Sequence, residues 1–515
     1  MDSVDPATGA IMARIPATPV GELPDVFRRA REAQRAWATR PLTERAQMLV
    51  RLRDMICQGR DEIVDLVSRE SSKPRIEAIF ADLLIVLDTA DFLSHRAPRW
   101  LHPERVAHHN VAFKAKSGWL EYAPHGVVAI ISPWNYPFAI PMSQAIAAVM
   151  AGNAVVLKPS ELTPATGALV GELFRRAGFP ADVVQTVQGA GELGAALIEC
   201  APDKVIFTGS VATGKRVAEA CAQRLIPSVL ELGGKDAMIV LGDGDLDVAS
   251  SAAVWGSFTN CGQACLSVER IYVEQSVVER FTKLCVEKTK KLRVGPASDP
   301  DAEIGPMIRL RQLEKVEEQL HDAIEHGAQI LTGGERRTDL GANFMEPTVV
   351  ANVDHSMKLM KEETFGPVLA IRAVASAKEA VEMANDSPFA LSASVWTRDV
   401  HRARRIASEL RAGSVMINDL ISYYGMSEAP HGGSRASGWG HTHSRLGLLE
   451  MVQVKYVDVD RLPGIKKAWW FGYSSKLADS ARGFVDAAIC SAVEALKGML
   501  ARKGAGGVVF RGHRI

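Results

Sequence analysis

The stretch GVVAIISPWNYPFAIPMSQAIAAVMAGNAVVLKPSE, residues 126–161, decides the fold of this chain. Residues 126–133 form a short β-rich apolar run that ends at a proline turn, which is typical of a buried parallel strand. Residues 140–153 indicate a helix that ends at Gly-Asn, and residues 154–161 contain a second buried strand. A strand, a helix and a strand in this order predict parallel pairing across a helical connection.

The same alternation continues on the C-terminal side of this stretch. Residues 163–180 indicate a helix that begins with Thr-Pro, where threonine is the N-cap and proline the first helical residue. The segments 183–189 and 204–210 indicate strands, and residues 211–224 indicate another helix. These units predict a doubly wound parallel sheet.

A second region of alternating strands and helices follows and places the whole chain in the α/β class. Its segments are helical at 277–292, 378–386 and 400–410 and extended at 344–353, 393–397 and 412–419. On the N-terminal side, residues 21–100 have the spacing of several amphipathic helices. Residues 111–122 and 448–460 alternate apolar and polar side chains, as half-exposed strands do.

Bulk properties exclude several classes of protein. The 515 residues exceed one ordinary core, and 47% hydrophobic with 23% charged residues fits a globular protein of two or three domains. Lysine plus arginine equals aspartate plus glutamate, at 60 each, so no bulk attraction to nucleic acid is expected. The N-terminus does not resemble a signal peptide, and no stretch approaches a membrane span. A cytoplasmic location is expected.

Residues 461–515 differ from the rest of the chain. They contain ten lysines and arginines but three acids, a net charge of +7. Aromatic residues cluster at 469–473, and residues 474–503 indicate an amphipathic helix. This pattern in 469–503 suits peripheral contact with a membrane interface, but docking on a neighbouring subunit explains it as well. Residues 504–515 are expected to be disordered.

The segment TNCGQAC, residues 259–265, contains two of the seven cysteines. An odd, scattered set of cysteines in a long chain does not indicate a disulfide framework. Cys261 and Cys265 lack further nearby ligands, so no metal site is expected there. They are either a buried pair or include a nucleophile. The His-Thr-His sequence at 441–443 is likewise too sparse for a metal.

Glycines and charged residues that follow predicted strands form one group of candidate ligands. Gly209 and Ser210 end a strand and Gly214 begins a helix, where free backbone N–H groups suit a pyrophosphate. Lys158 and Glu161 follow another strand and could contact a ribose or a phosphate. Each segment alone is equally consistent with an ordinary turn.

Four further residues have side chains suited to chemistry or ligand contact. Asn135 lies in a rigid Pro-Trp-Asn-Tyr-Pro turn and could donate to an oxyanion. Glu231 ends an apolar strand, where it could act as a general base or pair with a lysine. Glu363 and Phe365 could contact a sugar and a flat ring.

Taken together, PWNYP, KPSE, FTGS, LELGGK, GQxC, EETFGP and PxGG occur in the order that resembles the aldehyde dehydrogenase superfamily, over roughly residues 1–460. The resemblance implies an NAD(P)-dependent enzyme of the hydrolytic type. It implies a doubly wound parallel-sheet cofactor domain, a second α/β catalytic domain and a small β oligomerisation element. The corresponding ranges are 1–110 with 125–233 for NAD binding, 234–430 for catalysis, 111–124 with 448–460 for oligomerisation, and 461–515 for the extension.

The resemblance also implies roles for individual residues. Cys265 matches the nucleophile, Glu231 the general base and Asn135 the side chain of the oxyanion hole. Cys261 matches no catalytic position and is expected to be a packing residue. The positions that match cofactor contacts are Trp134, Lys158, Glu161, Gly209, Ser210, Gly214, Glu363 and Phe365.

From these roles we expect oxidation of an aldehyde to a carboxylic acid through a cysteine thiohemiacetal and thioester. Glu161 should repel a 2′-phosphate and so favour NAD over NADP. Tyr423, Tyr424 and Met426 lie in segment 419–430, which is expected to border the aldehyde tunnel and to favour an apolar or aromatic substrate. A homodimer or homotetramer is expected. The alternatives are a non-catalytic protein on the same fold and a cofactor-free thiol esterase.

Overall fold

The computed structural model describes residues 1–467 and 469–490. The chain divides into two compact units. The first contains Met1–Leu101 and Ala123–Gln453, and the second contains His102–Tyr122 and the described residues from Val454 onward. The α/β fold class predicted from the sequence is confirmed.

A six-stranded sheet forms the centre of one half of the first unit. Its strands β5 to β9 are parallel, and only the short β17 runs antiparallel to its neighbour β9. Every residue of β5 and β6 is buried, which explains their unbroken apolar sequences. The strand order is β17 (Gly438–Trp439), β9 (Ser228–Glu231), β8 (Lys204–Thr208), β5 (Val127–Ile131), β6 (Ala154–Lys158) and β7 (Val184–Thr186).

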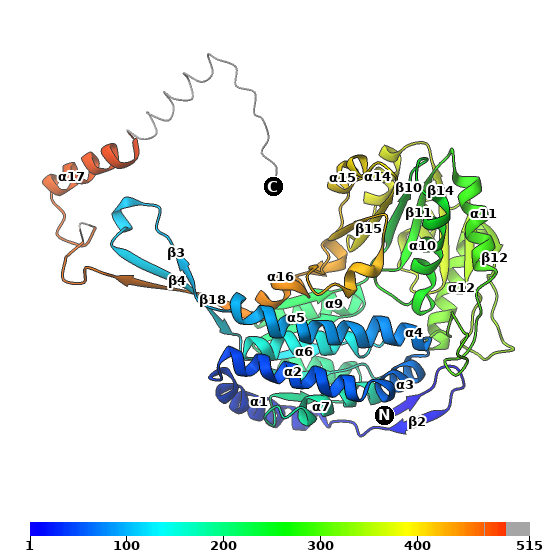
Figure 1. Cartoon of the computed structure of the whole chain (residues 1–515), viewed down its shortest axis with the longest axis horizontal. Coiled ribbons are helices and arrows are strands. Elements are labelled where there is room, and N and C mark those ends of the chain that lie inside the picture. The colour runs from blue at the N-terminus through cyan, green and yellow to red at the C-terminus, as the bar shows by residue number, and fades with distance from the viewer. Residues whose placement is uncertain (468, 491–515) are drawn as a thin grey trace, which may run out of the picture. The chain divides into compact units, whose positions relative to one another are not determined.

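Helices pack on both faces of this sheet, so it is doubly wound as expected, and Figure 1 labels several of these helices. Side chains of α1, α8 and α9 form one core cluster with alternate residues of the central strands. Helix α6 is buried along its whole length and packs against α5 and α2. The helices are α1 (Leu23–Ala38), α2 (Leu42–Gln58), α3 (Arg60–Ser71), α4 (Arg75–Glu77), α5 (Leu84–Trp100), α6 (Ala139–Ala151), α7 (Pro164–Arg176), α8 (Gly191–Glu199) and α9 (Val211–Gln223).

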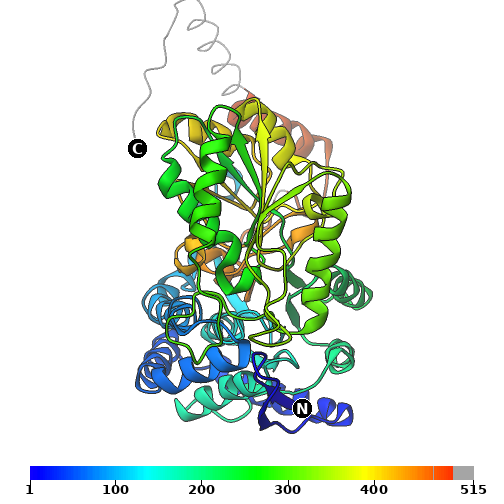
Figure 2. The same cartoon turned by 90° about the vertical axis from the view of Figure 1, so that its right-hand side faces the viewer.

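A seven-stranded sheet forms the other half of the first unit, and Figure 2 shows its strands with helices on either side. Its strands are parallel except for β12 at one edge. Their order is β12 (Gln329–Thr332), β13 (Thr348–Ala351), β14 (Val368–Val374), β11 (Val268–Glu274), β10 (Asp236–Val240), β15 (Ser392–Trp396) and β16 (Ser414–Ile417). The helices are α10 (Leu246–Phe258), α11 (Val278–Thr289), α12 (Leu310–Glu325), α13 (Lys358–Lys361), α14 (Ala377–Asn385) and α15 (Val400–Glu409). Helix α16 (Ser444–Leu449) packs against α5 and α6 of the other half.

The connection between the two sheets brings the predicted site residues together. Glu231 is the last residue of β9, and only four residues separate it from β10, which begins at Asp236. Cys265 lies three residues before β11 begins. Glu231 and Cys265 therefore both lie in segments that connect the end of β9 with the starts of β10 and β11. The reversal of strand order between β5 and β8 is the position at which doubly wound sheets bind ligands.

The second unit is built on a three-stranded antiparallel sheet in the order β18 (Val452–Asp460), β4 (Lys116–Pro124) and β3 (Glu104–Val106). The predicted strand 111–122 starts later than expected, because residues Val111–Phe113 form a 3-10 helix. In the extension, α17 (Ser475–Val485) and a π-helical turn (Asp486–Cys490) form the first part of the predicted helix 474–503. The remainder of that helix and the segment 504–515 lie outside the described residues.

None of the helices in the described part of the chain has the length and apolar character needed to span a bilayer.

Candidate active site

Two cavities of the first unit meet at Cys265. One, of about 210 Å³, extends along the segments that follow β5, β8 and β9. The other, of about 350 Å³, extends between η2 (Ala78–Leu83), α5, α10 and the 3-10 turn Ile421–Gly425. Four residues line both cavities: Ile140, Thr208, Glu231 and Cys265. The thiol of Cys265 can therefore be approached from either cavity.

A tight turn places the Cys265 thiol at this junction. Asn260 and Cys261 have φ angles of 51° and 57°, and Gly262 follows at 70°. A Cβ on Gly262 would collide with the backbone carbonyl of Gly366, so the position requires glycine. Cys261 is buried in the hydrophobic core, with its Sγ 3.6 Å from Sδ of Met307.

The Cys265 thiol lies among carboxylates. Burial raises its pKa, and the carboxylates of Asp236, Glu231 and Glu363 raise it further. The resting side chain is therefore a neutral thiol at physiological pH. Attack on an electrophile requires removal of its proton, which a nearby base or an additional positive charge would promote.

Asn135 makes two hydrogen bonds with the same turn and a third with Lys73. Its Nδ2 donates to the carbonyl of Gln263 at 3.1 Å. Its backbone carbonyl accepts from Nζ of Lys73 at 2.7 Å and from Nδ2 of Asn260 at 3.0 Å. Lys73 is in turn paired with the buried carboxylate of Asp82, at 2.6 Å. The amide is therefore fixed beside Cys265 by residues that are distant in sequence.

Glu231 is buried, and its carboxylate faces His431. Nε2 of His431 lies 3.2 Å from Oε2 of Glu231. Both side chains line the larger cavity together with Cys265. The lysine pairing considered from the sequence is not observed for this carboxylate among the described residues.

The smaller cavity brings together most of the predicted cofactor contacts. Trp134 and Phe365 pack edge to face at 5.5 Å between ring centroids. Ser210 caps α9 by accepting from the backbone N–H of Thr213. Glu363 accepts from the backbone N–H of Gly234 at 3.2 Å. The predicted contacts that line the cavity are Trp134, Gly209, Ser210, Glu363 and Phe365.

Three predicted contacts lie outside the lining of this cavity. Nζ of Lys158 lies 3.7 Å from Oε2 of Glu161 at the end of β6, and burial lowers the pKa of the lysine. Gly214 lies beneath Leu232, where a Cβ would collide with the leucine side chain. Gly214 therefore allows α9 to pack closely against the segment that follows β9.

The model of the aldehyde dehydrogenase family matches residues 1–457 of this sequence. The chain belongs to the aldehyde dehydrogenase family. As a member it oxidises an aldehyde to a carboxylic acid, and the comparisons lend no support to a non-catalytic protein.

Several known aldehyde dehydrogenases are similar over most of this chain. A 4,4'-diapolycopene aldehyde oxidase of Methylomonas sp is 39% identical over 94% of this chain and 90% of its own length. A putative succinate-semialdehyde dehydrogenase [NADP(+)] of Mycolicibacterium smegmatis is 39% identical, with 88% of each chain covered. The solved structure of betaine aldehyde dehydrogenase from Staphylococcus aureus in complex with NAD+ has a TM-score of 0.86 at 30% identity, covering 92% of this chain and 93% of that one.

Some residues of this aldehyde dehydrogenase site were missed from the sequence. Arg309, Gln312 and Lys315 line the smaller cavity, but no local motif marks them. Lys73 donates to the backbone carbonyl of Asn135, which is 62 residues away along the chain, and no sequence pattern reveals such a contact. His431 could have been identified from the sequence, because it occupies the variable position of the PxGG motif.

The direction of Tyr423 differs from the expectation. Tyr424 and Met426 line the larger cavity, as expected, but Tyr423 is buried in a cluster with Leu266 and Leu391. The 3-10 turn Ile421–Gly425 sends consecutive side chains in different directions, so the two tyrosines cannot both face the cavity.

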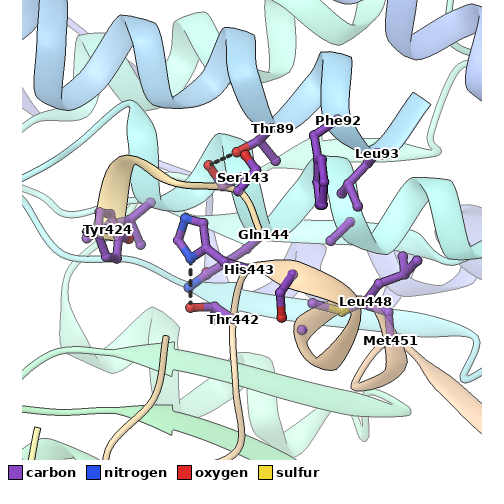
Figure 3. A pocket seen from close by; sticks show the side chains of 15 residues that line it. Thr89, Phe92, Leu93, Ser143, Gln144, Tyr424, Thr442, His443, Leu448 and Met451 are labelled. Atoms are coloured by element: carbon purple, nitrogen blue, oxygen red, sulfur yellow. Dashed lines mark hydrogen bonds between the residues drawn. The ribbon is translucent and has the colours of Figure 1, made fainter. Parts of the chain in front are cut away.

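A third, small cavity of about 20 Å³ lies behind Tyr424 (Figure 3). The side chains of Gln144, Thr442 and His443 point toward it, with Thr442 Oγ1 3.3 Å from Nδ1 of His443. Its size suits about one water molecule. Burial lowers the pKa of His443 to about 3, so this histidine is neutral at physiological pH.

Proposed function

We propose that this aldehyde dehydrogenase is NAD-dependent, with Cys265 as nucleophile, Glu231 as general base and Asn135 as oxyanion donor. The observation that supports this assignment is the position of Cys265 at the junction of the two cavities, with Glu231 lining both. One cavity would hold the cofactor and the other the aldehyde.

In this mechanism the proton of the Cys265 thiol passes through a water molecule to Glu231 and on to solvent, and the Sγ thiolate then attacks the aldehyde carbon. The resulting thiohemiacetal oxyanion accepts hydrogen bonds from the side chain of Asn135 and from the backbone N–H of Cys265. Bound NAD supplies the acceptor for the hydride that leaves this carbon, so that a thioester remains on Cys265. Glu231 then deprotonates water, which attacks the thioester and releases the acid.

The residues of the smaller cavity suit a dinucleotide. The backbone N–H groups at the start of α9 suit a pyrophosphate, and the glycine at 209 keeps the approach open. Lys158 and Glu161, which lie outside the lining of this cavity, would hold the adenosine ribose, and Glu363 within it would accept from the nicotinamide ribose. Glu161 is exposed, and its charge would repel a 2′-phosphate. A clear preference for NADP in kcat/KM would refute this part of the proposal.

The larger cavity supports an apolar aldehyde as substrate. Its walls include Phe80, Leu84, Trp255, Leu266 and Met426. Among the described residues, no lysine or arginine lines it, and the carboxylate of Glu231 would repel a charged acid. This lining suits a hydrocarbon-chain aldehyde, such as the one in the name of the Methylomonas relative, better than succinate semialdehyde.

The exposed edge of β18 supports pairing between subunits, as a homodimer or a dimer of dimers. This strand carries three exposed apolar side chains, Val454, Tyr456 and Val459. Helix α17 buries no residue of its own, which supports docking of the extension on a neighbouring subunit, with a membrane interface as the alternative. The free cysteines of the described residues suit a reducing cytoplasm.

Rapid-mixing measurements of NADH formation test the catalytic assignment. Cys265→Ala should abolish aldehyde oxidation, whereas Cys261→Ala should retain most of it. Glu231→Gln should keep the first burst of NADH and slow the later turnover, because hydride transfer precedes hydrolysis. Full activity of Cys265→Ala would overturn the assignment.

A panel of aliphatic, aromatic and charged aldehydes tests the substrate class. The highest kcat/KM is expected for a long aliphatic or aromatic aldehyde. If succinate semialdehyde had the highest kcat/KM, the interpretation of the larger cavity as a site for apolar aldehydes would be wrong.

A further inference from the structure

The carboxylate of Glu231 lacks the hydrogen bonds that a buried charge normally has. Its side chain is 5% exposed. Neither carboxylate oxygen has a hydrogen-bond partner among the described residues. An ionised carboxylate in such surroundings is destabilised unless a donor faces it. The group within reach is Nε2 of His431, at 3.2 Å, on a side chain that is 4% exposed.

His431 is itself held in place from several directions. Its backbone forms an isolated bridge with Thr442 through hydrogen bonds of 2.9 and 2.7 Å. Its Nδ1 lies 3.0 Å from the hydroxyl of Tyr423. The ring of Tyr424 packs edge-on against it at 4.8 Å. The imidazole therefore has little freedom to turn away from Glu231.

The two neighbours of the imidazole select one tautomer. A carboxylate next to Nε2 favours a proton on that nitrogen, which leaves Nδ1 as an acceptor. The hydroxyl of Tyr423 can then donate to Nδ1, and burial raises the pKa of this tyrosine well above its ordinary value, so the hydroxyl keeps its proton. Tyr423, His431 and Glu231 thus lie next to one another, and a small turn of the carboxylate would let Nε2–H donate to it.

We propose that His431 is a positioning residue for Glu231: its Nε2–H orients the carboxylate and keeps it ionised for hydrolysis of the thioester. The proposal rests on the role of Glu231 given above. In that step an O–H bond of water breaks and its proton goes to Glu231. The water oxygen bonds to the acyl carbon, the C–S bond breaks and its electron pair stays on Sγ of Cys265. The histidine keeps its proton throughout.

The proposal predicts a particular pH dependence. A buried carboxylate without a donor holds its proton more tightly, so loss of the Nε2–H should move the acid limb of deacylation to higher pH. The titratable groups that face His431 are Glu231, Tyr423, Tyr424 and His443. Both tyrosine pKa values are raised well above their ordinary range and the His443 pKa is lowered to about 3, so none of these three titrates near neutrality.

The test acylates the cofactor-free, full-length enzyme with p-nitrophenyl hexanoate. Excess reagent is removed, and loss of the acyl group from Cys265 is followed by intact mass between about pH 6 and about pH 9.5. In His431→Phe, deacylation should fall about tenfold near pH 7 and recover at high pH, which is an upward shift of the acid limb by about one unit. In His431→Gln, which keeps an N–H donor, the limb should stay close to that of the parent enzyme.

Two further variants keep the outcome interpretable. Tyr423→Phe removes the hydroxyl that holds Nδ1 of His431, so it should shift the acid limb of the deacylation profile in the same direction by a smaller amount. This variant tests the proposal even if His431→Phe misfolds. His441→Gln changes an exposed histidine nearby and should have no effect. Equal pH profiles for the parent, His431→Phe and Tyr423→Phe would overturn the proposal. Unchanged deacylation in Glu231→Gln would instead overturn the role of the base itself.

Discussion

At the scale of single residues, two cysteines that are four positions apart in this aldehyde dehydrogenase have very different surroundings. Cys261 packs into the core beside Met307, whereas Cys265 reaches the junction of two cavities. The backbone turn with three successive positive φ angles separates them. Identity of the side chain alone would not distinguish the two.

Alkylation by iodoacetamide should separate them in a single peptide. In the cofactor-free enzyme, Cys265 should be labelled and Cys261 should not. Because the pKa of Cys265 is raised, its thiolate fraction below that pKa should grow about tenfold per pH unit, and the labelling rate should rise with it. Peptide mass spectrometry at several pH values measures both. A rate that is flat from about pH 6 to about pH 9 would contradict the raised pKa.

Cofactor affinity should depend on pH through Glu363. Burial, and then the neighbouring carboxylate of Glu269, raise the pKa of Glu363 to about 7. A protonated carboxyl accepts from ribose hydroxyls less well than a carboxylate, so the Kd for NAD should rise as pH falls through about 7. Titration calorimetry at pH values on either side measures this change. The pH dependence should be lost in Glu363→Gln, and its persistence there would assign it to another group.

At the scale of elements, the loop between β5 and α6 owes its position to a buried ion pair. Nζ of Lys73 bridges Asp82 and the carbonyl of Asn135, while Asp82 accepts from the backbone N–H groups of Phe138 and Ala139 at the start of α6. One pair thereby fixes both the backbone of Asn135, the proposed oxyanion donor, and the first turn of a helix.

Replacement of Lys73 should therefore lower the free energy of unfolding. Lys73→Met leaves the carboxylate of Asp82 buried without its partner, so we expect a loss of about 3–5 kcal/mol and a lower kcat. Urea unfolding followed by circular dichroism measures the stability. Arg75→Met is the matched control, because the Arg75–Asp65 pair is exposed and should contribute less than about 1 kcal/mol. Equal losses in the two variants would contradict the importance of the buried pair.

The sequence predicted those elements whose signal is local. Residues 126–161 gave β5, α6 and β6 because buried parallel strands are unbroken apolar runs. Cys265, Glu231 and Asn135 could be singled out because each lies in a motif. Lys73 and Arg309 could not, since their role arises from contacts with distant segments. The start of β4 and the direction of Tyr423 depend on 3-10 turns, whose short pitch has no clear sequence period.

At the scale of the whole molecule, the extension after residue 460 is the part least explained by the family fold. The family model ends at residue 457, but the alignment with the Methylomonas relative covers 94% of this chain and so continues into the extension. Trp469, Trp470 and Phe471 are exposed there, with Phe471 at 95%.

Truncation after Pro463 distinguishes the two uses of this surface. If the extension docks on a neighbouring subunit, truncation should lower the oligomer mass in sedimentation, and neither form should co-sediment with anionic liposomes. If it binds a membrane, only the full-length protein should co-sediment at low salt, with its oligomer mass unchanged by truncation. An unchanged mass without any liposome binding would contradict both.

The two cavities that meet at Cys265 have an evolutionary consequence. They share only four of their lining residues among those described. Mutations in the walls of the larger cavity can therefore accumulate without disturbing the other, and on the proposed roles a lineage could exchange one aldehyde for another while its cofactor site stays intact. Relatives of nearly equal similarity to this chain are named for a diapolycopene aldehyde and for succinate semialdehyde, so the aldehyde in the name differs between chains of similar sequence.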